Sequence, residues 1–85
     1  MNKINYNGNK NIISERLYEA RTKLRLSQTQ LAAQLQVLGM NIDQQSISKI
    51  EKNQRQVTDY EIMCLCKCLK VEPAWLMQNF SKYEI

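Results

Sequence analysis

Two adjacent glutamines, Gln44 and Gln45, have side chains suited to reading the edges of DNA bases. A glutamine amide can bond the two neighbouring groups that adenine shows in the major groove. Lys49 follows about one helical turn later, and lysine reaches guanine or phosphate. The same residues also suit the solvated face of an ordinary amphipathic helix, so the surrounding chain must decide between these two interpretations.

A helix over residues 44–52 would hold these polar side chains on one face. At a period of 3.6 residues, Ile47 and Ile50 fall together on the opposite, inward face. Asp43 comes directly before, where its carboxylate can accept from the free backbone N–H groups of the first turn. The outer face then carries only amides, a hydroxyl and ammonium groups, from Gln44, Gln45, Ser48, Lys49 and Lys52.

Positive charge gathers in the part of the chain that contains this helix. The formal net charge is +4, and residues 1–58 hold nine Lys or Arg against four Asp or Glu. Residues 59–85 hold three against four. This distribution suits a polyanionic partner such as nucleic acid, although a merely soluble basic protein would have the same balance.

The other reactive side chains favour neither catalysis nor metal binding. Cys64, Cys66 and Cys68 lie within one predicted helix, and an odd, bunched set is no disulfide framework. Cys64 and Cys68 share a face and could supply two ligands, but the chain has no histidine to complete a zinc site. There is also no Gly-rich phosphate loop. We therefore expect no cofactor and no small-molecule substrate, and an enzyme is the least favoured class.

Membrane and secretion signals are missing from the sequence. No apolar run approaches the roughly 20 residues of a membrane span. The first residues lack the apolar core of a signal peptide. We expect a cytoplasmic protein without a membrane partner.

Periodicity predicts five helices and no strand, so we expect one small all-α domain. The domain should span residues 11–79, between a frayed arm at 1–10 and a tail at 80–85. Helix starts are marked by the caps Ser27, Asp43 and Thr58 and by a proline in the last helix. The expected helices cover residues 11–24, 28–36 and 44–52, a fourth from Thr58 through Leu69, and a fifth from Pro73.

Apolar spacing predicts which face of each helix enters the core. Arg21 lies beside the apolar stripe of the first helix, and an arginine at a buried edge needs an anion. The expected inward residues are Ile13, Leu17, Ala20 and Leu24 in the first helix, Leu31, Ala32 and Leu35 in the second, and Ile62, Leu65, Cys66 and Leu69 in the fourth.

Taken together, these segments resemble the helix-turn-helix domain of the Xre/Cro family of phage and bacterial repressors. The resemblance covers about residues 12–78, and its combined spacing is specific. It rests on Arg21 with Leu24 and Ser27-Gln28, on Leu31-Ala32-Ala33-Gln34-Leu35, on Ile47-Ser48-Lys49-Ile50-Glu51, on Leu65 to Val71, and on Trp75-Leu76. It implies a five-helix, lambda-repressor-like DNA-binding domain, with an ion pair between Arg21 and Glu51.

The resemblance also implies a function and a site. The chain would be a sequence-specific regulator of transcription, a repressor, that binds double-stranded DNA as a homodimer. Gln44, Gln45 and Lys49 would face base edges, whereas Gln28 would contact a phosphate. The full expected set of DNA-binding residues is Gln28, Gln44, Gln45, Ser46, Ser48, Lys49, Lys52 and Arg55.

The connection before the base-reading helix departs from the family. Three or four residues are usual at this turn, and here about seven, residues 36–42, separate the expected helices. Either the second helix extends, or a loop bulges toward DNA and carries Met40 or Asn41 into the groove. Asn53 stands where the family often has Gly, and it can adopt the same left-handed conformation.

An alternative function keeps the fold but uses it to bind protein. The chain would then be an interaction module, antitoxin-like or an anti-repressor, with little DNA binding.

Trp75, Phe80 and Tyr83 are large apolar side chains near the end of the sequence, and they predict docking on the chain's own core or on a second copy. No effector domain follows the fifth helix, so we expect regulation through a partner, concentration or competition.

Overall fold

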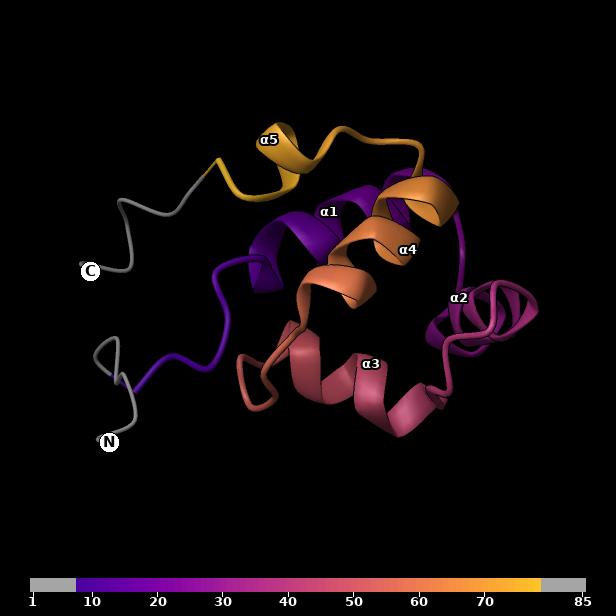
Figure 1. Cartoon of the computed structure of the whole chain (residues 1–85), viewed down its shortest axis with the longest axis horizontal. Coiled ribbons are helices and arrows are strands. Elements are labelled where there is room, and N and C mark those ends of the chain that lie inside the picture. Colours follow the sequence, from indigo (N-terminus) through magenta and orange to yellow (C-terminus); the bar gives the residue numbers. More distant parts are fainter. Residues whose placement is uncertain (1–7, 79–85) are drawn as a thin grey trace.

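Five helices and no strand make up residues 8–78, the part of the chain that the computed structural model describes (Figure 1). The prediction of an all-α, five-helix fold is therefore confirmed. None of the described helices combines the length and the apolar character needed to cross a membrane. The helices are α1 (Ser14–Lys23), α2 (Gln28–Val37), α3 (Gln44–Glu51), α4 (Asp59–Leu69) and α5 (Pro73–Leu76).

The core forms where the apolar faces of these helices meet. Ile47 and Ile50, the two isoleucines of α3, are fully buried, and α3 packs against α1 and α2. Figure 1 shows α3 along one edge of the molecule, so its other side is left open. The fully buried side chains are Ile13, Leu17, Leu31, Leu35, Ile47, Ile50, Leu65 and Leu76.

Side-chain caps begin α2, α3 and α4, as the sequence predicts. Ser27 Oγ accepts from the Gln30 backbone N–H at 3.0 Å, and Gln30 Oε1 accepts from the Ser27 N–H at 2.8 Å. Asp43 Oδ1 accepts from the Ser46 N–H at 2.8 Å. Thr58 forms a second capping box at the start of α4. Each cap satisfies backbone donors that have no partner inside the helix.

A left-handed residue follows each of the first four helices. For α3, the Asn53 N–H donates to the Ile50 carbonyl at 3.0 Å and the Gln54 N–H donates to the Lys49 carbonyl at 2.7 Å, which is a Schellman motif. Three of the four positions hold a residue with a Cβ atom, for which this conformation is unfavourable. The residues with positive φ at these four helix ends are Arg25, Gly39, Asn53 and Lys70.

The first helix is shorter than predicted, because α1 begins at Ser14 and not at Asn11. Asn11 is buried, and its Nδ2 donates to the carbonyls of Ile50 (3.1 Å) and Arg55 (2.9 Å). Its Oδ1 accepts from the Ile13 N–H at 3.0 Å. A side chain bonded to nearby backbone in this way competes with helix formation.

Leu24 was expected in the core stripe of the first helix, and this prediction is wrong. Leu24 is the C-terminal cap of α1, and its exposed fraction is 38%. Arg25 is left-handed, with φ 58°, and this conformation ends α1 at Leu24.

The described end of the predicted arm contacts the end of α3. The Lys10 and Asn11 backbone N–H groups both donate to Asn53 Oδ1, at 2.7 and 2.9 Å. Asn53 Nδ2 in turn donates to Asn9 Oδ1 at 2.5 Å. The rest of the arm, residues 1–7, lies outside the described residues.

The long connection between α2 and α3 folds inward. The helix α2 extends to Val37, and Gly39 reverses the chain with φ 89°. Met40 and Ile42 are buried in the core, and Gln36 Nε2 donates to the Ile42 carbonyl at 2.7 Å. The longer α2 and the burial of Met40 and Ile42 therefore shorten the open part of the connection, and Met40 is unavailable to a DNA groove, whereas Asn41 is exposed.

The last helix docks on α1. Leu76 is fully buried, and the Arg16 guanidinium lies 4.4 Å from the centroid of the Trp75 ring. Arg16 Nη2 also donates to Gln78 Oε1 at 3.0 Å. Trp75 thus packs on its own chain, whereas Phe80 and Tyr83 lie outside the described residues.

Candidate nucleic-acid interface

The open face of α3 carries the polar residues that the sequence singled out. Because Ile47 and Ile50 face the core, the side chains between and before them must point outward. Gln44, Gln45 and Lys49 are exposed, as is Lys52, which caps the C-terminus of the helix. The serines Ser46 and Ser48 are half-buried.

A buried ion pair holds α3 against α1. Arg21 Nε donates to Glu51 Oε2 at 2.5 Å, and Arg21 Nη2 donates to Glu51 Oε1 at 3.0 Å. The side chains are only 10% and 7% exposed. Arg21 Nη1 also donates to the Leu26 carbonyl at 2.8 Å, and the hydrogen bond with Glu51 raises the pKa of Arg21. The pair joins the end of α3 to the turn before α2.

A chain of hydrogen bonds leads from this ion pair to the start of α3. Gln28 Nε2 donates to Glu51 Oε1 at 3.0 Å. Gln28 Oε1 accepts from Gln44 Nε2 at 2.6 Å. The position and direction of the Gln44 amide are therefore linked to Glu51 through Gln28, which lies in the first turn of α2.

The hydrogen bond to Gln28 leaves the Gln44 amide with unused capacity. A glutamine amide has two N–H donors and a carbonyl oxygen with two lone pairs. One donor is bonded to Gln28, so one N–H and the carbonyl oxygen of this exposed residue remain available. One donor and one acceptor, side by side, are what adenine N7 and N6 require in the major groove.

Arg55 has a partner that the sequence interpretation did not anticipate. Its Nη1 and Nη2 donate to the two carboxylate oxygens of Glu61 at 3.0 and 2.9 Å. Glu61 Oε1 also accepts from the Thr58 N–H at 2.9 Å. The Arg55 side chain is 28% exposed, and its hydrogen bond lowers the pKa of Glu61. Arg55 was expected as an open cation for phosphate, but it also secures the loop after α3 to the start of α4.

Two of the three carboxylates near the outer face of α3 are paired with arginines. Glu51 is neutralised by Arg21, and Glu61 by Arg55. Asp43 is bonded to the Ser46 backbone, which lowers its pKa. Of these three carboxylates only Asp43 lacks an arginine partner, and its charge interacts with Lys49, so the exposed ammonium groups of Lys49 and Lys52 together leave this surface positive.

Asn11 and Asn53 support the site, and sequence reasoning missed this role for Asn11. Together they bond the segment before α1 to the last turn of α3 and to the following loop. A signal is present at Asn53, whose left-handed tendency the sequence predicts. Nothing local marks Asn11, because its carbonyl partners lie 39 and 44 residues away.

The cysteines form no part of this surface. Cys64, Cys66 and Cys68 are free thiols of α4, and burial raises the pKa of Cys66 and Cys68. Within residues 8–78 there is no cluster of three or more His, Cys, Asp or Glu side chains able to hold a metal ion.

Comparison with known proteins adds one finding. A family model described as helix-turn-helix matches residues 17–76, from α1 to the last residue of α5. The match includes the ion pair, the α2–α3 unit and all of the expected DNA-binding residues. Neither a curated protein nor a solved structure matches the chain.

Proposed function

The chain belongs to the Xre-type helix-turn-helix family of DNA-binding regulators, and on that premise we propose that it reads a specific sequence in double-stranded DNA as a repressor. The helix α3 enters the major groove with its N-terminal end closest to the bases, as is usual for this motif. Gln44 and Gln45 are the specificity pair, and Lys49 lies one turn further along.

The orientation of the Gln44 amide is the observation that best supports this proposal. Gln28 uses one Gln44 N–H, and the remaining donor and acceptor match adenine. An amide that was merely solvated would need no fixed partner on α2. We therefore expect an adenine at the base pair that Gln44 meets.

Phosphate contacts supply most of the affinity in this proposal, and base contacts supply the specificity. Gln28 has one N–H beyond the one bonded to Glu51, at the N-terminus of α2, where backbone N–H groups also favour an anion. Ser46, Ser48 and Lys52 flank the readers. Arg55 lies at the same edge, where its guanidinium can donate to a phosphate while it keeps Glu61 as its partner.

A homodimer completes the proposal. One α3 helix reaches only a few base pairs, and two copies related by a two-fold axis read two half-sites. The centres of the half-sites should lie about one helical turn of DNA apart, roughly 34–36 Å. A symmetric site of this spacing would support the dimer, and single isolated half-sites would argue against it.

Selection from random duplexes tests the reading. The wild-type chain should recover one motif, and Gln44→Ala or Gln45→Ala should relax it at one or two base pairs per half-site, by ~1–3 kcal/mol each. Gln34→Ala is the matched control, because Gln34 is an exposed glutamine of α2 outside the proposed contact set. An unchanged motif with both reader variants would show that α3 is not the reader.

A protein-interaction module is the second candidate, and exposed apolar side chains favour it. Val37 and Leu38, at the end of α2, are 86% and 42% exposed, and Tyr60 and Met63 of α4 are 76% and 58% exposed. Such groups often mark protein contacts. A salt titration with random duplex separates the candidates, since a DNA reader loses affinity steeply as salt rises and an interaction module binds no duplex.

A further inference from the structure

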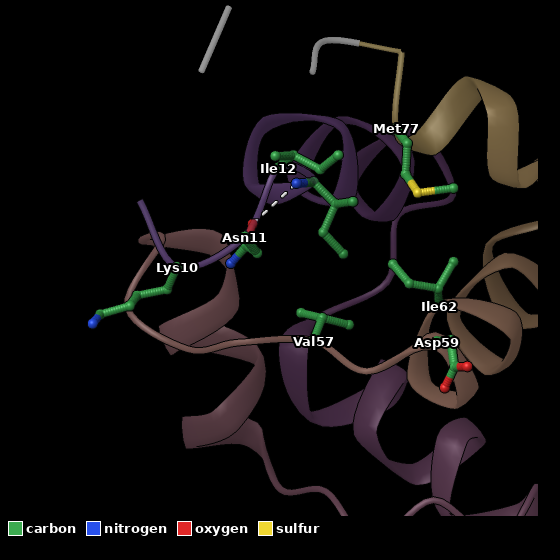
Figure 2. Close-up of a pocket in the computed structure, with 8 residues that line it drawn as sticks. Lys10, Asn11, Ile12, Val57, Asp59, Ile62 and Met77 are labelled. Carbon is green, nitrogen blue, oxygen red and sulfur yellow. Dashed lines mark hydrogen bonds between the residues drawn. The ribbon is translucent and has the colours of Figure 1, made fainter. Parts of the chain in front are cut away.

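An apolar groove lies on the side of the molecule where the segment before α1, the start of α4 and the end of α5 meet (Figure 2). Its volume is about 390 Å³. Figure 2 shows the side chains of Ile12, Val57, Ile62 and Met77 around a common space. All four are half-buried and pack against the core, yet each keeps an open side toward the groove.

This groove belongs neither to the DNA-reading face nor to the polar chain that supports it. Asn11 is one of its lining residues, and the side chain of Asn11 is hydrogen-bonded to backbone groups. Its rim carries one exposed cation, Lys10, and one exposed anion, Asp59. The groove is therefore an apolar surface with no role in the proposed readout, and an apolar surface of this kind calls for a cover.

We propose that the chain's own segment 79–85 covers the groove, with Phe80 as the anchoring side chain. The segment is Asn79-Phe80-Ser81-Lys82-Tyr83-Glu84-Ile85. It begins two residues after Met77, which already forms one wall of the groove. Phe80 is three positions after Met77, and three residue steps span at most about 10 Å, so Phe80 stays within reach of the groove.

Proximity favours this segment over a second copy of the chain. A group attached by a short linker has an effective concentration in the millimolar range. A second copy at micromolar concentration is about a thousandfold more dilute. A phenylalanine that becomes buried removes ~150–250 Å² from water, which suits an apolar groove better than solvent.

The charges of the segment also match the rim. The segment contains one lysine, Lys82, and one glutamate, Glu84, and the rim has one carboxylate, Asp59, and one ammonium, Lys10. Segment and rim each have one positive and one negative charge. Surface ion pairs contribute little binding energy, so these charges orient the segment more than they strengthen its binding. The apolar contact of Phe80 remains the main interaction.

Nuclear Overhauser contacts in the full chain test the proposal directly. The Phe80 ring should contact the methyl groups of Ile12, Ile62 and Met77. In an equal mixture of isotope-labelled and unlabelled chains, filtered spectra should show these contacts within one copy and not between copies. Contacts between copies would overturn the proposal, because the groove would then be an interface of two chains.

Thermal unfolding of variants gives an independent measurement. Phe80→Ala should lower Tm by roughly 4–8 °C, by the same amount at every protein concentration. Phe80→Leu keeps an apolar anchor, so it should lower Tm less while it abolishes the ring-current shifts of the methyl groups in these three residues. Tyr60→Ala is the matched control, since Tyr60 is 76% exposed and lies outside the groove.

Two results, if found together, would overturn the proposal. If Phe80→Ala and Tyr60→Ala have the same small effect on Tm, and the methyl shifts do not move in either Phe80 variant, the groove is not covered by this segment. None of these measurements involves DNA, so they can fail while the proposed readout stands, and the reverse also holds.

Discussion

Replacing Glu51 by glutamine should destabilise the fold strongly while it preserves the shape of the side chain. Arg21 is 10% exposed and Glu51 is 7% exposed, so the substitution leaves a guanidinium charge buried without its anion. Breaking a buried pair in this way costs about 3–5 kcal/mol. The amide oxygen of the introduced glutamine can still accept one hydrogen bond from Arg21, so we expect the lower end of that range.

The consequence for unfolding is large, because small domains have a free energy of unfolding of only about 5–15 kcal/mol. In a domain of this size, 1 kcal/mol corresponds to a change in Tm of roughly 4–8 °C. A loss of about 3 kcal/mol should therefore lower Tm by roughly 12–24 °C. Urea denaturation followed by far-ultraviolet circular dichroism measures the same change as a lower midpoint.

Glu19→Gln is the matched control. Glu19 also pairs with an arginine, Arg16, but at 3.4 Å, and its side chain is 60% exposed. Exposed substitutions of this kind usually change stability by no more than about 0.5 kcal/mol. If Glu51→Gln and Glu19→Gln unfold at the same temperature, the buried pair does not hold α1 and α3 together, and the reasoning is wrong.

Three further predictions concern the caps and the second ion pair. Lys70→Gly should raise stability by about 1 kcal/mol, because Lys70 is left-handed with φ 59° and glycine adopts this conformation without strain. Lys67→Gly, inside α4, should lower stability by about 1 kcal/mol, and the urea midpoints of the two variants measure both changes. Lys52→Ala and Arg55→Ala should each reduce the salt slope of duplex binding by about 1, but only Arg55→Ala should also lower Tm, since it leaves Glu61 without its partner. The Arg55 hydrogen bond lowers the pKa of Glu61 below its ordinary value of 4.5. The stability that this ion pair contributes is therefore complete above pH 4.5 and is lost as pH falls through the lowered pKa. Glu61→Gln should flatten the acid limb of a plot of Tm against pH, and an unchanged limb would contradict this prediction.

The parts of the fold that could be predicted from sequence are those governed by local chemistry. Ser27, Asp43 and Thr58 act on backbone groups within their own first turn, so their type and position suffice to mark three helix starts. The same is true of Pro73. The inward faces followed from periodicity, because Ile47 and Ile50 can share one side only if α3 is helical.

The errors and omissions come from contacts between distant segments. Asn11 lies outside α1 because backbone groups of Ile50 and Arg55 bind its side chain, and nothing near Asn11 in the sequence shows this. Leu24 lies outside the core because the chain reverses at Arg25, a residue type that has little intrinsic tendency to be left-handed. Such tertiary constraints override local preference.

The candidate site shows the same division. The exposure of Gln44, Gln45 and Lys49 followed from the helical period alone. The hydrogen bonds of Gln28 to both Glu51 and Gln44 cross between helices, and only the folded chain brings these three side chains together. Gln28, for which a phosphate contact stays a prediction, therefore also has a structural role that the sequence did not reveal.

The position of Gln28 between the ion pair and Gln44, the proposed reader, has a consequence for how this protein can evolve. A free glutamine side chain samples many rotamers, and fixing one on binding costs ~0.5–1.5 kcal/mol. Because Gln28 is hydrogen-bonded to Gln44 in the chain without DNA, a substitution at position 28 should change the cost of the proposed base recognition without removing a base contact. Positions 28 and 44 should thus be epistatic, and a new binding specificity at 44 is expected to require an accompanying change at 28.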